Sequence, residues 1–288
     1  MKLTTPVNFE GLPSPFRLTD AICVIGSCFA DAIGGRLSAA GFDVLCNPFG
    51  TLYNPASVAS AAARLDSGAP FGPEDCVEMG AGAGRVGSFS HHTSFARATA
   101  EEFLAHANAR LAEDAGRWLA CKRVIVTLGT AWVWRALERP GQPVVANCLK
   151  RPAREFSHEL LSVDACAALL HGLVATHPDK QFLFTVSPIR HLGEGAHANT
   201  LSKSTLHLAL QQVLDGDALR AQYFPAYEIL LDELRDYRFY ADDLVHPSSA
   251  AVQIIWERFL DTCTDPADRP ALLAAEKATR AAGHRPLR

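Results

Sequence analysis

Residues 21–30 read AICVIGSCFA, and this stretch decides the fold. The apolar run 21–25 predicts a buried strand, Gly26 predicts a tight turn, and residues 29–40 combine helix formers with an apolar stripe at Ile33 and Leu37. After Gly41, residues 42–46 resume a strand pattern. The order strand, turn, helix, strand predicts a βαβ unit.

The same pattern recurs further along the chain. Residues 123–128 form an apolar, β-branched run before Gly129, and residues 181–186 form another before Ser187. Such runs are typical of strands that are buried on both faces. Helical patterns cover residues 100–115, 162–176, 202–215 and 249–262. The alternation predicts an α/β fold with three layers, in which helices cover both faces of a parallel sheet.

Two segments interrupt this alternation. Residues 131–147 contain two apolar runs around a polar turn, which predicts a hairpin inserted after the third strand, and residues 67–92 are rich in glycine. Both are expected to roof a site at the carboxyl edge of the sheet. We expect an N-terminal extension over residues 1–20, one catalytic domain over residues 21–265 and a C-terminal tail over residues 266–288.

Composition narrows the class of protein. The 288 residues are 48% hydrophobic and 20% charged with a formal net charge of −4, so no nucleic-acid or membrane partner is expected. No apolar run has the length of a signal peptide or of a spanning helix of ~18 residues, which predicts a soluble cytoplasmic protein. The eight cysteines are scattered without a Cys-x-x-Cys pair, so reduced thiols and no structural zinc are expected.

Cys28 is a candidate nucleophile. It follows the strand and the Gly26 turn at the start of a helix, where free N–H groups and the helix dipole favour negative charge. An acidic, reactive thiol is one interpretation, and a buried structural cysteine is the other. Dinucleotide binding is not indicated, because no second and third glycine follow Gly26. No cofactor is therefore expected.

Asp243 and His246 are a candidate catalytic pair near the other end of the chain. They lie three residues apart in a loop before the last helix. A carboxylate on one imidazole nitrogen fixes the tautomer, so that the other nitrogen can accept the proton of a nucleophile. The competing interpretation is a turn-capping aspartate next to a surface histidine.

Several motifs together resemble the GSCFA family, which is placed among the SGNH-type hydrolases. They are residues 25–30 (IGSCFA), 47–55 (NPFGTLYNP), 90–92 (SHH), 129–132 (GTAW), 187–191 (SPIRH) and 236–241 (DYRFYA). The resemblance covers roughly residues 20 to 260. It implies a flavodoxin-like SGNH fold and a site of the acyl-transfer type.

The resemblance also assigns roles to single residues. Gly26 matches the glycine of the SGNH Gly-Asp-Ser block and Cys28 matches its serine, so Cys28 is the expected nucleophile, and Ser27 takes this role if the turn is one residue shorter. Gly50 resembles the glycine whose N–H faces the oxyanion. Asp243 and His246 resemble the last block in spacing and place.

The third block departs from the SGNH pattern. Gly129-Thr130 begins it, but the asparagine that would bind the oxyanion is missing. Because one lost oxyanion donor can cost ~10²-fold or more in rate, a replacement is expected. The candidates are Thr130, Asn147 and one of the adjacent pair His91 and His92, for which a metal-binding role is disfavoured because no partner ligand has suitable spacing.

Three other features have two interpretations each. Arg190 and His191 follow a strand and would bind an anionic or sugar group, or are simply solvated. Lys203 is a site residue or an exposed residue in the first turn of a helix. Trp132 and Trp134 belong to a strand and form either core or a wall that stacks a sugar ring.

The resulting hypothesis is an acyl-ester hydrolase or acyltransferase that acts through a covalent acyl-enzyme. A small-molecule ester or an acylated carbohydrate is the expected substrate. The alternative is a non-catalytic module that keeps the fold to bind a glycan or an acyl ligand. The sequence leaves the acyl group, the acceptor and the oligomeric state open.

Overall fold

A five-stranded parallel sheet forms the centre of the molecule. The computed structural model describes residues 5–283. The strand order is β10-β9-β5-β1-β2, and the strands are β1 (Ala21–Gly26), β2 (Asp43–Cys46), β5 (Arg123–Leu128), β9 (Gln181–Val186) and β10 (Ala221–Tyr223). Numbered along the sheet strands alone, this is the order 2-1-3-4-5 of a flavodoxin-like, doubly wound fold. The predicted fold class is confirmed.

Helices cover both faces of the sheet, because its side chains point alternately to two cores. Cys23 and Ile25 of β1 belong to one core, and Ile22 and Val24 belong to the other. The first core is covered by α2 (Pro55–Ser67), α3 (Ala100–Ala120), α4 (Val163–Thr176) and α5 (Gly195–Gly216). The second is covered by α1 (Cys28–Ala39), α6 (Ala226–Glu228), α7 (Ser249–Cys263) and α8 (Arg269–Gly283).

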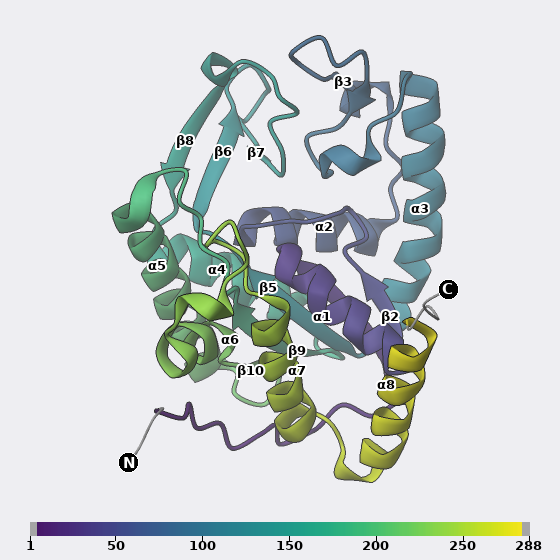
Figure 1. Cartoon of the computed structure of the whole chain (residues 1–288). Helices are drawn as coiled ribbons and strands as arrows, with labels where there is room; N and C mark the ends of the chain where they lie inside the picture. The colour runs from purple at the N-terminus through teal and green to yellow at the C-terminus, as the bar shows by residue number, and fades with distance from the viewer. Residues whose placement is uncertain (1–4, 284–288) are drawn as a thin grey trace, which may run out of the picture.

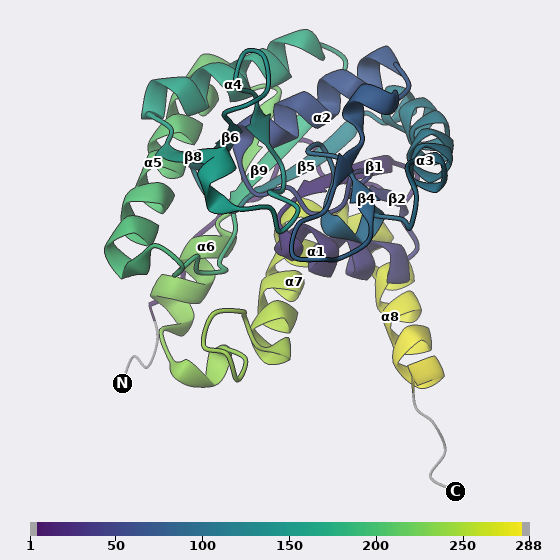
Figure 2. The same ribbon diagram turned by 90° about the horizontal axis from the view of Figure 1, so that it is seen from above.

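The two predicted insertions are present beyond the sheet. The hairpin consists of β6 (Trp132–Ala136) and β7 (Val144–Val145), and β8 (Phe156–Leu160) pairs antiparallel with β6. The segment after α2 carries a short ribbon of β3 (Val77–Glu78) and β4 (Val86–Gly87). Figure 1 shows both insertions at one end of the molecule, and Figure 2 views them from above. The sequence patterns did not predict α2, β8 or β10.

The segments outside residues 21–265 pack against the same body. The backbone N–H of Phe16 donates to the carbonyl of Cys263, and that of Leu18 donates to the carboxylate of Asp268. Leu272 of α8 is fully buried in the second core. The expected tail thus contains a docked helix up to residue 283, and residues 284–288 lie outside the described part.

Two further observations concern the helices and the cysteines. Among residues 5–283, no helix has both the length and the apolar character needed to cross a membrane. All eight cysteines are free thiols, and four of them are buried.

Candidate active site

The turn between β1 and α1 places three consecutive residues in different environments. Gly26 has φ +142°, and a Cβ there would lie 2.1 Å from the carbonyl oxygen of Thr127, so only glycine lets β1 approach β5 this closely. Ser27 is fully buried, and its hydroxyl lies 3.1 Å from that of Thr127 while it caps α1 at the N–H of Phe29. Cys28 is the first residue of α1.

Cys28 contacts His246, and His246 contacts Asp243 through its opposite ring nitrogen. The Sγ of Cys28 lies 3.7 Å from Nε2 of His246, and the opposite ring nitrogen, Nδ1, lies 2.6 Å from Oδ2 of Asp243. The relation is that of nucleophile, base and orienting carboxylate. The two predicted segments, which are more than 200 positions apart in the chain, therefore meet at one point.

The loop around Asp243 explains why this carboxylate is well placed. Its Oδ1 accepts the backbone N–H groups of both Val245 and His246 at 2.9 Å. Leu244 has φ +57°, which curls the loop so that these N–H groups point at Asp243. The hydrogen bonds from the His246 and Val245 backbones and from the His246 ring lower the pKa of Asp243 to about 2. Asp243 is thus an anion at neutral pH.

The expectation of an acidic Cys28 thiol is wrong. Burial is the largest effect on this group, and it raises the pKa of Cys28 although the N–H groups at the helix start lower it. The nearby Asp31 carboxylate raises it further, whereas Lys203 lowers it. A neutral thiol beside His246 is the resting state that follows.

Cys28 opens onto a cavity of about 450 Å³ between the sheet edge and the hairpin. Trp132 and Trp134 of β6 form one wall together with His158 of β8, whose ring stacks on Trp134 with centroids 3.9 Å apart. The wall is half-buried, so these rings are in part accessible. The position of Trp132 and Trp134 therefore fits the wall of a cavity better than the interior of the hydrophobic core.

A comparison with known protein families identifies the family of this chain. The GSCFA family model matches residues 21–259, which include β1, the Cys28 turn and the Asp243 loop. The chain belongs to the GSCFA family.

Other comparisons add little to this assignment. No curated protein matches the sequence. One similar solved structure is a mutant of an acetyl-xylooligosaccharide esterase from Geobacillus Stearmophilus, with 17% sequence identity and a TM-score of 0.33. The match covers 53% of this chain and 66% of the esterase.

The backbone N–H groups expected in the oxyanion hole of this GSCFA protein are only partly available. Gly50 donates its N–H to the carbonyl of Asn47 at 2.8 Å, so the predicted role of Gly50 is wrong. Gly129 and Thr130 both donate their N–H groups to the carbonyl of Tyr53. Cys28 occupies the first position of α1, where the N–H has no intrahelical acceptor.

Asn54 is a residue that the sequence motifs contained but did not single out. Its Oδ1 accepts the N–H of Ser57 and so caps α2, and its side chain lines the same cavity as Cys28. Within residues 5–283, no hydrogen bond engages its amide nitrogen, which leaves a donor facing the cavity. The signal in the sequence was its place in residues 47–55 just before Pro55, a pattern of helix starts.

Thr130 and the pair Arg190 and His191 also line the cavity. The Thr130 hydroxyl lies 2.9 Å from that of Ser202 and accepts the N–H of Trp132, so it is already engaged within the protein. His191 lies behind Gly129, and its Nε2 is buried without a partner in the described chain. Burial, followed by the charges of Lys203 and His246, lowers the pKa of His191 to about 4, so this ring is neutral at neutral pH.

Lys203 is buried and not exposed in a first helical turn. Helix α5 already begins at Gly195, and Lys203 is 2% exposed on its sheet-facing side. Its Nζ donates to the carbonyls of Gly129 and Ser187 at 2.7 Å each, one residue beyond the ends of β5 and β9. Burial lowers the pKa of Lys203 to about 7. Lys203 therefore links the carboxyl ends of β5 and β9, which lie at the edge of the site.

Three other predicted residues lie away from Cys28. His91 is buried among the rings of Phe49, Phe71, Phe95 and Phe103, and burial lowers its pKa to about 3. His92 contacts Ser94 through Nδ1, and the Oδ1 of Asn147 accepts the N–H of Leu149. None of the three lines the cavity of Cys28. The part of the chain from 5 to 283 contains no cluster of three or more His, Cys, Asp or Glu side chains that fits a metal ion.

Proposed function

We propose that this GSCFA protein is an acyl-ester hydrolase or acyltransferase in which Cys28 carries the acyl group. The observation that carries this proposal is the arrangement of Cys28 Sγ 3.7 Å from His246 Nε2, with Asp243 2.6 Å from Nδ1. For a sulfur atom, 3.7 Å is within hydrogen-bond distance, so the thiol and its base are already in contact.

The proposed reaction has two balanced steps. His246 Nε2 accepts the thiol proton as Cys28 Sγ attacks the carbonyl carbon of the ester. When the tetrahedral intermediate collapses, the C–O bond to the alcohol breaks and His246 returns the proton to the departing oxygen. Water or a second hydroxyl then attacks the thioester, His246 takes its proton, and the proton passes to the Cys28 sulfur as it leaves.

The raised pKa of Cys28 makes His246 necessary in this scheme. A thiol that is neutral at rest becomes nucleophilic only if a base removes its proton during attack. The anionic Asp243 stabilises the imidazolium that results. We assign the oxyanion to the N–H of Cys28 and the amide of Asn54, which stands in for the asparagine absent from the third block.

The wall of Trp132, Trp134 and His158 supports a substrate with a ring. Aromatic faces bury the apolar face of a sugar or another ring while its polar groups remain free to hydrogen-bond. An acylated carbohydrate is therefore the substrate class that the cavity fits best.

The alternative nucleophile, Ser27, has weaker support. Its hydroxyl is fully buried, faces Thr127 and caps α1, whereas the contact with His246 is made by Cys28. Ser27 is better explained as the residue that fixes the turn.

Mass spectrometry of the protein after reaction with p-nitrophenyl acetate tests the proposal. We expect one acetyl group on the peptide that contains Cys28, none in Cys28→Ala, and full labelling in Cys46→Ala, which removes another half-buried thiol. Ser27→Ala should keep most of the labelling. Acetylation that persists in Cys28→Ala but disappears in Ser27→Ala would assign the reaction to the serine instead.

A binding module without catalysis is the second candidate. The raised pKa of Cys28 and the occupied N–H groups of Gly50 and Gly129 favour it. In that case, Cys28 should react with activated esters and with iodoacetamide no faster than Cys148, and His246→Ala should not change its rate. A Cys28 rate that depends on His246 would exclude this candidate.

A further inference from the structure

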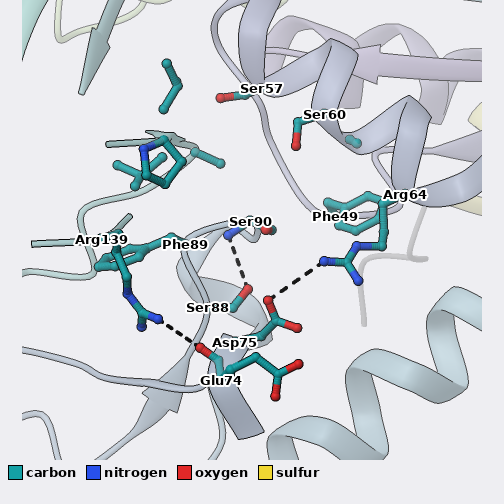
Figure 3. Close-up of a pocket in the computed structure, with 15 residues that line it drawn as sticks. Phe49, Ser57, Ser60, Arg64, Glu74, Asp75, Ser88, Phe89, Ser90 and Arg139 are labelled. Atoms are coloured by element: carbon teal, nitrogen blue, oxygen red, sulfur yellow. Dashed lines mark hydrogen bonds and ion pairs between the residues drawn. The ribbon is translucent and has the colours of Figure 1, made fainter. Parts of the chain in front are cut away.

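A second cavity of about 250 Å³ adjoins that of Cys28. Val145 and Ala146 line both cavities, while Asn54, which precedes α2, lines the first and Ser57 and Ser60 of α2 line the second. The two spaces therefore meet at Val145 and Ala146, close to the start of α2. Figure 3 shows the second cavity between α2, the segment of Ser88 to Ser90 and the hairpin that carries Arg139.

Hydroxyl groups characterise the wall of this second cavity. Ser57, Ser60, Ser88 and Ser90 all line it. The Oγ of Ser57 is buried and has no hydrogen-bond partner in the described chain, although its residue is only 6% exposed. Buried hydroxyls are almost always paired, so the unpaired Ser57 hydroxyl is the group on this wall to which a ligand would supply a missing hydrogen bond after a small rotation of the side chain.

The charges of the cavity balance. Arg64 lies 3.8 Å from the carboxylate of Asp75, and Arg139 donates to the carbonyl of Glu74 at 3.0 Å (Figure 3). The lining thus contains two guanidinium groups and two carboxylates, with no excess charge for an ionic ligand. Paired charges and hydroxyls present both donors and acceptors, which match a neutral ligand that itself carries several hydroxyls. Phe89 adds an apolar face.

We propose that this second cavity binds a neutral saccharide that accepts the acyl group from Cys28. The inference rests on the proposed acyl-enzyme. A hydroxyl oxygen of the saccharide attacks the thioester carbonyl, a C–O bond forms and the C–S bond breaks. The hydroxyl proton passes through His246 to the Cys28 sulfur. Hydrolysis is the competing reaction when the second cavity is empty.

Binding is tested separately from catalysis in the Cys28→Ala protein. Saturation-transfer NMR with cellobiose, galacturonic acid and glucosamine at millimolar concentration should show binding that is strongest for the neutral cellobiose. Ser60→Phe, which fills the cavity from an exposed position on α2, should abolish the signal. Ala63→Phe, an exposed position on the same helix that does not line the cavity, should preserve it.

Ser57→Ala probes the unpaired hydroxyl. Because this hydroxyl has no partner in the protein, its removal should leave the melting temperature unchanged and weaken cellobiose binding about fivefold. Absence of binding by all three sugars, or a preference for either charged sugar, would overturn the proposal. Binding that survives Ser60→Phe but is lost in Trp132→Ala would place the sugar in the first cavity and would equally overturn it.

Transfer is measured with vinyl acetate as donor and cellobiose as acceptor. We expect the ratio of acetylated cellobiose to free acetate to fall at least tenfold in Ser60→Phe and to stay unchanged in Ala63→Phe. If no acetyl-Cys28 forms at all, the proposed function fails, and the NMR result still decides whether the saccharide site exists. If acetyl-Cys28 forms but cellobiose is never acetylated, the acceptor role is refuted alone.

Discussion

Asp243 accepts hydrogen bonds from two backbone N–H groups and from the His246 ring, so one residue fixes both the loop and the imidazole tautomer. The Asn substitution keeps the size of the side chain and removes its charge. The imidazolium that forms when Cys28 is deprotonated would then lose its counter-ion. Residue Asp242 beside it is exposed and offers a matched control.

We expect Asp243→Asn to slow acetylation of Cys28 by vinyl acetate by about 10²-fold or more. Asp242→Asn should react at the rate of the original protein. The reaction is quenched at successive times, and mass spectrometry measures the fraction of Cys28 that is acetylated. Equal rates in the two variants would show that His246 acts without an orienting carboxylate.

Asn54 combines a cap and a free amide donor, and the two roles can be separated. Serine caps a helix as well as asparagine does, but it lacks the amide. Asn54→Ser should therefore preserve the melting temperature and lower kcat about 10²-fold with little change in KM, because an oxyanion donor acts only in the transition state. A loss of melting temperature with unchanged kcat would reduce Asn54 to a helix cap.

At the scale of elements, the turn from β1 to α1 was predictable because all its determinants are local. Gly26, Ser27 and Cys28 follow an apolar run and precede a helical stripe within ten residues. Helix α2 was missed because its Ala-rich sequence has few large apolar residues to mark a face. The sequence pattern predicts a helix start at residue 202, which puts Lys203 in the first turn. The helix begins at Gly195 instead, so Lys203 lies in its third turn and faces the sheet.

In the site, too, local sequence patterns predict what neighbouring residues form and miss what tertiary packing forms. Asp243 and His246 were predictable because three residues of spacing suffice to bring them together. The environment of His91 was not, since Phe71, Phe95 and Phe103 reach it from separate segments. Burial also decided the pKa of Cys28, where the helix start alone had suggested an acidic thiol. Effects that depend on tertiary packing lay beyond the sequence patterns.

The hairpin allows a test of substrate class. If Trp132 and Trp134 stack a ring, Trp134→Ala should raise KM for glucose pentaacetate about tenfold and leave KM for vinyl acetate, which has no ring, nearly unchanged. Leu137→Ala, at an exposed site on the same hairpin, serves as the control. An equal loss on both substrates would mean that the tryptophan supports the site only structurally.

Four of the eight thiols of the molecule are buried, and the other four are half-buried. Burial raises the pKa of Cys166 and of Cys263 to about 12, and all eight thiols are shifted in the same direction. Thiols in the unfolded chain ionise at about pH 8.5. At alkaline pH the thiols therefore stay protonated in the folded state but lose their protons in the unfolded chain. The free energy of unfolding consequently depends on pH above neutrality.

The sign of this dependence follows from linkage. Above about pH 8.5 the folded state binds more protons than the unfolded state, so the free energy of unfolding falls as pH rises toward about 12. Each fully buried thiol contributes a loss of about 2 kcal/mol by about pH 10. Lys203 acts in the opposite direction between about pH 7 and 10, because burial lowers its pKa, but it is a single group.

Urea unfolding under reducing conditions at about pH 8 and pH 10 checks this expectation. The original protein should lose several kcal/mol between the two pH values, and Cys263→Ala should lose about 2 kcal/mol less, since it lacks one fully buried thiol. Cys76→Ala removes a more exposed thiol and should change the loss much less. A free energy of unfolding that is the same at both pH values in the original protein would mean that these thiols ionise as readily in the folded state as in the unfolded chain.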